Sequence, residues 1–337
     1  MAAYTFSDVL IKPKYSDIES RKEVDISSDF GPFKLDLPII SAPMKSITEE
    51  KMSLEMHNNG GLGILHRFCS INEAIKTFHN SSSSPYSCGV SIGVQDEDKE
   101  RFDALFEEGA RIFCIDVANG YCKRVKDMIE WIMARNNDEK LNKAYIIAGN
   151  VATPEGARFL ADCGAHAIRV GIGPGRTCTT RKNTGIGVPQ LYSLMTIYEE
   201  LENANPRPRI IADGGIRCIG DISKCLKYSD AAMVGSFISG TSETPGAAFK
   251  DENGLYYKVY KGSASGETKV EYGKANEYVE GIAIKVPFRG RVKYILREIA
   301  EGLKSAFSYT NSRTLEEFHK NCEFIEITGG GKEESKL

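Results

Sequence analysis

Short, continuously apolar runs alternate with longer amphipathic segments along most of the chain. In the longer segments, such as 96–108 and 121–134, apolar residues recur at the spacing of a helix. Asp96 or Asp98 is expected to cap the first of these helices, and Thr153 is expected to cap a later one. The short runs have the composition of strands buried on both faces, which is typical of parallel β–α–β units. Eight such strands are predicted, at 38–41, 61–66, 87–94, 111–116, 144–148, 167–170, 209–212 and 231–234.

Eight β–α units favour a TIM (β/α)₈ barrel over an open doubly wound sheet, which is the alternative fold. Residues 1–328 are expected to form a single catalytic domain with an amino-terminal extension before the first strand. The polar stretch at about 250–285 is too irregular for a simple crossover and predicts a mobile flap. The polar, glycine-rich residues 329–337 predict a disordered tail.

Composition excludes several classes of function. The formal net charge is −3 and the pI is about 6.1, so no basic field for nucleic acid is expected. No apolar run approaches the roughly 20 residues that cross a bilayer, and the first residues do not resemble a secretory signal. The nine cysteines are scattered without a CxxC pair, which predicts neither a zinc site nor a disulfide framework. We therefore expect a cytoplasmic protein that binds neither nucleic acid nor membranes.

The predicted strands end in polar or glycine-rich sequences, and functional residues of such barrels lie at the carboxyl ends of the strands. The segment GIGPGRTCTTR follows the sixth strand and contains Cys178 close to Arg176, Arg181 and Lys182. Its glycines allow the backbone to approach a ligand, and nearby positive charge favours a nucleophilic thiolate. A buried structural cysteine is the alternative, which we prefer for the other eight. For Cys178 this loop favours a covalent nucleophile.

The ends of the last two strands predict phosphate binding. Asp213-Gly214-Gly215 follows the seventh strand, and Gly235-Ser236 follows the eighth. Loops after these two strands commonly bind phosphate in barrels through backbone N–H groups. A carboxylate such as that of Asp213 suits the two hydroxyls of a ribose. Together the two motifs indicate a nucleotide.

These motifs resemble the IMP dehydrogenase/GMP reductase family over roughly 5–328. TFSDVLIKPKYSDIESRKEVDIS resembles the opening segment of that family. Nine further motifs then occur in the order of the family, namely SAPMKSITE, GLGILHR, IDVANGY, AGNVAT, GIGPGRTCTT, ADGGI, VGSFISGTSETPG, YKGSAS and EGIAIKVPFRG.

The resemblance implies a homotetrameric barrel in which Cys178 attacks C2 of a purine nucleoside monophosphate. It implies backbone carbonyls of Gly173, Gly175 and Cys178 as a candidate site for a monovalent cation such as K⁺, which the dehydrogenase branch binds. It implies a nicotinamide cofactor at Arg67, Asp116, Ala118, Asn119 and Gly120. It implies substrate binding at Met44, Asp213, Gly215, Gly235, Ser236, Tyr260, Gly262 and Ser265, and we add Arg176 as a candidate phosphate contact.

Four features favour the reductase branch. LHRFC continues directly into SINEAIKTF, where dehydrogenases usually carry an inserted pair of CBS domains. DVANGY and TCTTRKNTGIGVPQ resemble the reductase more, and segment 266–279 lacks the Arg-Tyr pair with which dehydrogenases activate water. Thr180 and Glu280 match the reductase residues that handle departing ammonia. The resemblance thus implies NADPH-dependent reductive deamination of GMP to IMP and ammonia, with Thr180 and Glu280 relaying a proton.

Three residues depart from the family pattern and leave other substrates open. Arg176 stands where a serine is frequent, so it either alters the phosphate site or faces solvent. Lys45 replaces an acidic residue and could be compensated by Glu49, and Glu277 replaces an arginine, which leaves NADH open. The alternatives are an IMP dehydrogenase without CBS domains that makes XMP with NAD, an oxidoreductase for a modified or deoxy purine nucleotide, and a catalytically silent nucleotide-binding barrel.

Overall fold

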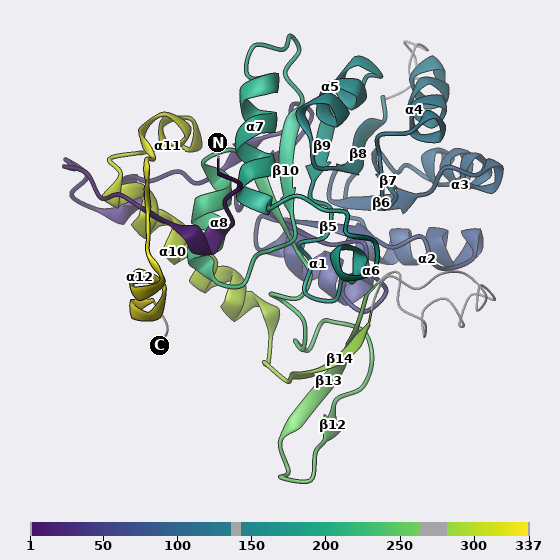
Figure 1. Cartoon of the computed structure of the whole chain (residues 1–337). Coiled ribbons are helices and arrows are strands. Elements are labelled where there is room, and N and C mark those ends of the chain that lie inside the picture. The colour runs from purple at the N-terminus through teal and green to yellow at the C-terminus, as the bar shows by residue number, and fades with distance from the viewer. Residues whose placement is uncertain (1, 136–142, 263–281, 336–337) are drawn as a thin grey trace.

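A closed barrel of eight parallel strands forms the centre of the molecule (Figure 1). The computed structural model describes residues 2–135, 143–262 and 282–335. The strands follow one another around the barrel in chain order, and β11 closes it by pairing with β4. All eight predicted strands are therefore confirmed, as is the barrel. The strands are β4 Ile39–Ser41, β5 Leu62–Leu65, β6 Cys88–Ile92, β7 Ile112–Asp116, β8 Tyr145–Val151, β9 Ala167–Val170, β10 Arg209–Asp213 and β11 Ala231–Val234.

Helices surround the barrel because each has an apolar face that packs on the outer side of the strands. The helix α10 packs against both α8 and α1 and so completes the outer layer where β11 meets β4. The outer helices are α1 Glu50–Asn58, α2 Ile71–Ser81, α3 Asp96–Glu107, α4 Lys123–Arg135, α5 Pro154–Asp162, α7 Gln190–Leu201, α8 Ile219–Leu226 and α10 Val292–Tyr309. The remaining helical segments are η1 Phe6–Asp8, η2 Arg21–Glu23, α6 Thr180–Thr184, α11 Leu315–Asn321 and α12 Gly329–Glu334.

Two of the predicted helix caps can be compared with the structure. The Thr153 side chain accepts a hydrogen bond from the Gly156 N–H at 3.3 Å, as expected. At the start of α3, however, the N-cap position is Gln95 rather than Asp96 or Asp98. Asp98 acts from within the first turn, where its carboxylate accepts the N–H groups of Gly93 and Gln95 at 2.8 and 2.9 Å. The prediction of an N-cap at Asp96 or Asp98 was therefore wrong. Asp98 lies inside the first turn, and its carboxylate accepts N–H groups of residues that precede the helix.

The amino-terminal end of the barrel is closed by aromatic side chains. The hairpin of β2 Ser28–Asp29 and β3 Lys34–Leu35 brings Phe30 and Phe33 to this end. The Phe33 ring meets that of Tyr145, the first residue of β8, edge-on at 5.1 Å between centroids. These rings belong to the apolar cluster that fills the barrel interior. The polar interior residues described below lie at the opposite, carboxyl-terminal end.

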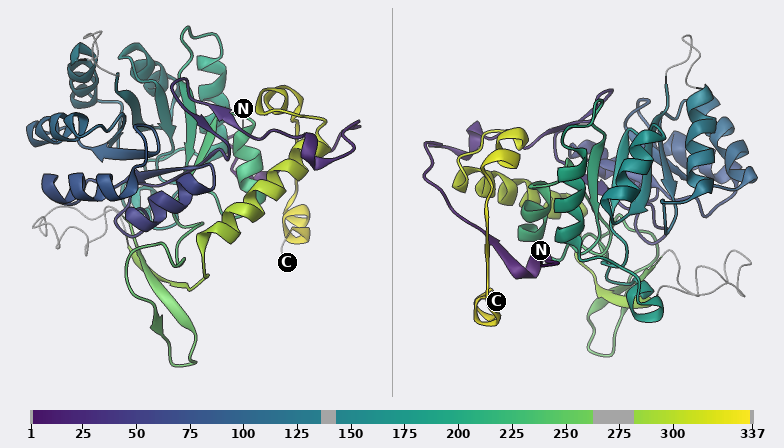
Figure 2. Two further views of the ribbon diagram at one scale, coloured as in Figure 1. Left: turned by 180° about the vertical axis from the view of Figure 1, so that it is seen from behind. Right: turned by 45° about the horizontal axis from the view of Figure 1, so that its top comes forward.

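A three-stranded antiparallel sheet projects from the barrel beside α6 (Figures 1 and 2). It consists of β12 Phe249–Lys250, β13 Tyr256–Lys261 and β14 Ala283–Pro287, with Tyr260 paired to Ile284. The described part of the segment predicted to be irregular is thus a regular sheet, and the rest of the predicted flap lies outside the described residues. Lys258 anchors it, because its buried ammonium donates to the Thr241 and Thr244 carbonyls at 3.0 and 2.5 Å.

Segments near the two ends of the chain pair with each other. The strand β1 Val9–Ile11 pairs antiparallel with β15 Phe324–Glu326. Residues 329–334 form the helix α12, so the expected disordered tail is wrong over this range. The Thr328 hydroxyl accepts the Gly331 N–H at 3.4 Å, and Lys332 pairs with Asp8 of the amino-terminal segment at 2.5 Å. None of the helices in the described ranges is long and apolar enough to cross a membrane.

Candidate active site

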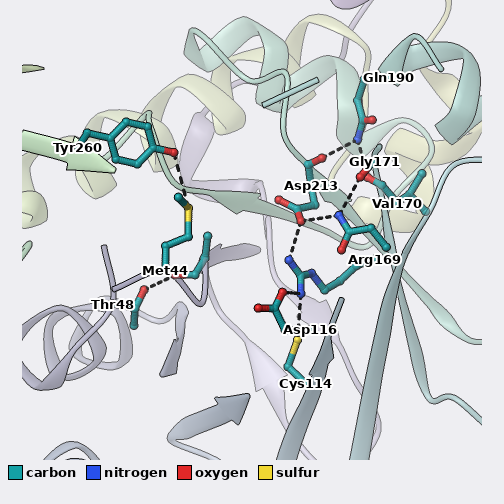
Figure 3. Close-up of polar contacts among 12 residues, drawn as sticks. Met44, Thr48, Cys114, Asp116, Arg169, Val170, Gly171, Gln190, Asp213 and Tyr260 are labelled. Atoms are coloured by element: carbon teal, nitrogen blue, oxygen red, sulfur yellow. Dashed lines mark hydrogen bonds and ion pairs between the residues drawn. The ribbon is translucent and has the colours of Figure 1, made fainter. Parts of the chain in front are cut away.

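A buried arginine lies between two aspartates at the carboxyl end of the barrel (Figure 3). The Arg169 side chain points inward from β9 and the residue is 5% exposed. Its Nη1 donates to Asp116 Oδ1 at 2.7 Å, and its Nη2 donates to Asp213 Oδ2 at 2.8 Å. Asp116 ends β7 and Asp213 ends β10, so one guanidinium connects strands on either side of β8 and β9. Both aspartates were predicted site residues, whereas Arg169 was not.

Gly149 of β8 makes this connection sterically feasible. Its position lies between Asp116 and Arg169 in the register of the sheet. A Cβ atom at Gly149 would stand 2.6 Å from the Arg169 Cβ. The absence of a side chain on β8 therefore leaves the space that Arg169 occupies.

The charges of this cluster stabilise one another. Burial by itself lowers the pKa of Arg169, but the adjacent Cys114 sulfur and the carboxylates of Asp213 and Asp116 raise it well above its ordinary value. Burial raises the pKa of Cys114 to about 11, so this thiol is protonated at neutral pH. A buried guanidinium that bonds to two carboxylates is well compensated, whereas removing one partner would leave an uncompensated charge.

Asn150 and Gln190 fix the remaining parts of this cluster. The Asn150 Nδ2 donates at 2.8 Å both to Asp213 Oδ2 and to the Gly171 carbonyl. The Gln190 Nε2 donates to the Val170 carbonyl at 2.6 Å and to the Asp213 carbonyl at 3.3 Å. Asp213 Oδ2 thus receives two donors. Within the described ranges its Oδ1 makes no side-chain hydrogen bond and is available to a ligand.

The loop after β9 packs against the turn after β10. Gly171 has φ +150°, and a Cβ atom there would stand 2.0 Å from the Asp213 carbonyl oxygen, so only glycine fits. Further along, Pro174 contacts both Gly214 and Gly215 closely. The predicted nucleophile loop and the predicted ribose and phosphate residues therefore meet in space.

Cys178 is exposed at the end of this loop. Its thiol donates to the Thr180 hydroxyl, with 3.2 Å between Sγ and Oγ1. The structure thus brings together two of the three predicted catalytic residues, and the third, Glu280, lies outside the described residues. Arg181 was expected to supply positive charge to Cys178. Arg181 also hydrogen-bonds to the Val188 carbonyl and lies against Gly173, which fastens the two ends of this segment.

Tyr260 connects the projecting sheet to the barrel (Figure 3). Its buried hydroxyl lies 3.6 Å from the Met44 sulfur and close to Gly235. Burial raises the pKa of Tyr260 to about 12, although a hydrogen bond with Thr177 and the positive charge of Arg176 act in the opposite direction. Arg176 is exposed but near enough to act on this hydroxyl. The predicted residues Met44, Gly235, Tyr260 and Arg176 therefore share one region of the site.

Two other predicted substrate residues lie at its edge. Ser236 begins the turn after β11, where its carbonyl accepts the Ser239 hydroxyl at 2.7 Å. Gly262 follows β13 and donates its N–H to the Ile282 carbonyl at 3.2 Å. Ser265 lies outside the described residues.

The predicted cofactor residues are grouped around the end of β7. Ala118 and Asn119 are exposed, and the Gly120 N–H donates to the Asn150 carbonyl at 2.7 Å. Arg67 follows β5 and stacks on Phe68 with 5.0 Å between guanidinium and ring centre. Its Nε is buried and makes no hydrogen bond within the described part of the chain. This donor is therefore available to a bound group.

Lys45 and Glu49, the residue considered as its partner, line the same cavity. Glu49 pairs with His66, whose Nε2 lies 3.3 Å from Glu49 Oε1. The pKa of Glu73 is lowered first by hydrogen bonds from Ser70, and the positive charge of Lys45 contributes to the same shift. Lys45, Glu49, His66 and Glu73 line one cavity of about 350 Å³ beside α1 and α2. Glu277 lies outside the described residues.

Sequence reasoning missed Arg169, Asn150 and Gln190. A signal existed for Arg169, because a charged residue inside a continuously apolar strand requires a buried partner. Asn150 stood in a motif at a strand end, but no role was assigned to it. Gln190 carried no local signal, since it contacts backbone carbonyls that only the fold brings near.

Comparison with known proteins agrees with this geometry. The model of a family described as IMP dehydrogenase / GMP reductase domain matches residues 3–337. The chain belongs to the IMP dehydrogenase/GMP reductase family. Among curated members of this family, it is 36% identical to a GMP reductase of Oenococcus oeni, with 94% of each chain covered. It is 37% identical to a GMP reductase of Leptothrix cholodnii, with 95% of each covered.

A solved structure of the family is also similar over its full length. It is a GMP reductase from Trypanosoma brucei in complex with guanosine 5′-monophosphate. The TM-score is 0.92 at 25% sequence identity, and the match covers 100% of this chain and 98% of that one. The resemblance stated from sequence motifs is therefore confirmed at the level of the family and its barrel.

Proposed function

We propose that this protein is a GMP reductase that converts GMP to IMP and ammonia with NADPH. The observation that carries the proposal is the hydrogen bond between Cys178 and Thr180, on a loop that packs against the turn of Asp213 and Gly215. These contacts support a thiol nucleophile and a proton-relaying hydroxyl beside a nucleotide site. The similarity to curated GMP reductases supports the same assignment.

The nucleotide would lie between the loops after β9, β10 and β11. Asp213 would accept the ribose hydroxyls through Oδ1, since Oδ2 already receives Arg169 and Asn150. The guanidinium of Arg176 would contribute to phosphate binding. Met44, which touches Tyr260, would lie beside the purine. The phosphate and the adjoining part of the nucleotide would be surrounded by Gly215, Gly235, Ser236, Tyr260, Gly262 and Ser265.

The nicotinamide cofactor would lie over Asp116 and the segment Ala118–Gly120. The residues present fit such a group, because the Arg67 Nε is a buried donor without a partner in the described structure. When bound, NADPH supplies the hydride that reduces C2. The choice of NADPH over NADH rests on the resemblance to reductases and on the positive charge of Arg67.

The chain's own residues handle the covalent step and the protons. The Cys178 sulfur bonds to C2 of the purine, and its proton moves to the Thr180 hydroxyl. This proton reaches the 2-amino group through Thr180 and Glu280 as the C2–N bond breaks, so that the nitrogen leaves C2 as ammonia. After C2 has been reduced, the C–S bond breaks, its electron pair returns to Cys178, and the thiol regains a proton.

The cation site implied for the dehydrogenase branch has weaker support in this chain. The Gly175 carbonyl already accepts the Cys178 N–H at 3.1 Å, and the Arg181 side chain lies against Gly173. A fixed guanidinium beside the loop disfavours a second positive charge there. The family resemblance further supports a cytoplasmic homotetramer.

The test is oxidation of NADPH by the purified protein with GMP, together with assays for ammonia and IMP. We expect turnover in the wild type and in Cys218→Ala, which removes another exposed cysteine, and none in Cys178→Ala. Production of NADH from IMP and NAD, without turnover of GMP, would instead identify a dehydrogenase. Absence of both activities, with GMP still bound, would indicate a silent nucleotide-binding barrel.

A further inference from the structure

We propose that Arg169 makes the binding of the nucleotide and the binding of the nicotinamide cofactor depend on each other. This inference rests on the proposed function, which assigns Asp213 to the ribose and Asp116 to the cofactor. The two carboxylates belong to β10 and β7, yet both bond to one guanidinium (Figure 3). Arg169 is thus a positioning residue that touches both binding regions through their carboxylates.

The hydrogen bonds of the cluster are unevenly distributed. Asp213 Oδ2 has a second donor in Asn150, at 2.8 Å. Among the described residues, Asp116 receives only the Arg169 donor. The orientation of Asp116 therefore depends on Arg169 more than that of Asp213 does. Two carboxylates and one guanidinium also leave one net negative charge in a largely buried cluster.

The direction of the effect follows from this distribution. Ribose hydroxyls that donate to Asp213 Oδ1 would spread its negative charge and weaken its attraction for Arg169 Nη2. The guanidinium would then bond more strongly to Asp116 and hold that carboxylate for the cofactor. Bound nucleotide would therefore strengthen cofactor binding, and reciprocity requires the cofactor to strengthen nucleotide binding by the same factor.

The shape of the arginine side chain is essential to this coupling. A guanidinium is a planar fork that bonds to two acceptors at once, whereas a lysine ammonium on its flexible stem acts as a point charge. Arg169→Lys keeps the positive charge of the cluster but would serve one carboxylate at a time. We expect this variant to bind both ligands, but neither ligand should change its affinity for the other.

The experiment measures two dissociation constants by titration calorimetry. One is that of NADP⁺ for the protein alone, and the other is that of NADP⁺ for the protein saturated with GMP, a pair between which no hydride can be transferred. In the wild type we expect GMP to lower the NADP⁺ Kd by about fivefold or more, the lower end of usual coupling. In Arg169→Lys we expect the ratio of these two NADP⁺ dissociation constants to be about one, with both ligands still bound.

Arg158→Lys is the matched control, because Arg158 pairs with Glu200 on the outer helices at 2.9 Å. Its ratio should equal that of the wild type. If Arg169→Lys raised both NADP⁺ dissociation constants by the same factor, their ratio would be unchanged. Arg169 would then have a purely structural role, and the proposal would be overturned. A ratio of one in the wild type would overturn it as well.

Asp116→Asn provides a second route if Arg169→Lys does not fold. It removes the charge on the cofactor side while leaving the pair of Arg169 and Asp213. The ratio should again fall to about one, and a ratio equal to that of the wild type would contradict the coupling. Failure of the proposed function would look different, since the wild type would then not bind GMP or would not oxidise NADPH with it.

Discussion

The Cys178 thiol donates a hydrogen bond to the Thr180 hydroxyl across 3.2 Å. The two residues are separated by one position, at the point where the loop after β9 enters the short helix α6. The same contact that orients the sulfur provides a path for its proton. The chemistry proposed for this site therefore depends on the hydroxyl as much as on the thiol.

Thr180→Val should lower kcat for GMP reduction by about a hundredfold or more, since it removes a group that relays protons. The Kd for GMP should change little, because the substitution keeps the shape of the side chain. Thr180→Ser keeps the hydroxyl and should retain most of the activity. The measurement is steady-state NADPH oxidation with calorimetric GMP binding. Equal activity of Thr180→Val and Thr180→Ser would exclude the hydroxyl from the reaction.

Arg181→Ala should reduce turnover although Arg181 is not proposed to touch the substrate. Its guanidinium bonds to the Val188 carbonyl and its stem lies against Gly173, so it joins the start and the end of the nucleophile loop. Loss of this clamp should misplace Cys178 and cost about tenfold or more in kcat. Lys182→Ala, at the exposed neighbouring position, is the control and should behave like the wild type. Equal effects of the two substitutions would mean that only the local charge matters.

The eight strands could be predicted because burial on both faces demands largely apolar runs, as in Ala231–Val234. The strand β13 escaped prediction because its pairing with β14 bridges residues far apart in the sequence. The helix α12 has no buried residue, and a cap by Thr328 and a pair between Lys332 and Asp8 stabilise it. The sequence therefore has no apolar periodicity that would predict this helix.

The candidate site was predictable where residues stand at strand ends. Asp116 and Asp213 could be named because the carboxyl ends of barrel strands converge on one face. Arg169 carried a signal of its own, but its contact with these two aspartates could not be predicted. That contact depends on the register of β8 between β7 and β9, and on Gly149 at the crossing point. Sequence patterns give the face of a residue but not its neighbours across the barrel.

Arg176→Ser tests whether the unusual arginine belongs to the phosphate site. Arg176 is exposed, yet its charge acts on the buried Tyr260 hydroxyl, so its guanidinium faces the region proposed for the phosphate. The substitution should weaken GMP binding by about tenfold or more and leave guanosine binding nearly unchanged. Competition titrations with GMP and guanosine provide the comparison. If the guanidinium pointed to solvent, the substitution would change the affinities for GMP and guanosine by the same factor.

Tyr260 should make the protein less stable at alkaline pH. Its pKa is about 12 in the folded protein, above the ordinary value of 10.0, so its contribution to stability is complete below pH 10 and is lost as the pH rises toward 12. Near pH 11 the loss should be about 1.4 kcal/mol. Urea unfolding near pH 8 and near pH 11 measures it. Tyr260→Phe should reduce the difference between the two pH values by this amount, and an unchanged difference would show that other groups cause the alkaline loss.

Gly149→Ala should reduce both the stability and the activity of the protein, although it adds only one methyl group. The new Cβ would stand 2.6 Å from the Arg169 Cβ and 2.8 Å from its carbonyl oxygen, and neither atom belongs to a flexible side-chain end. We expect a loss of about 1–3 kcal/mol in the free energy of unfolding, as for overpacked interiors. The rate of NADPH oxidation should fall by more than the loss of folded protein explains, because Arg169 can no longer bond to both Asp116 and Asp213. Gly329→Ala, where the added atom meets nothing within 4 Å, is the control and should change neither property. Thermal unfolding and NADPH oxidation, measured on the same samples, separate the two effects. Full activity in Gly149→Ala would mean that the bridge between the two carboxylates is dispensable.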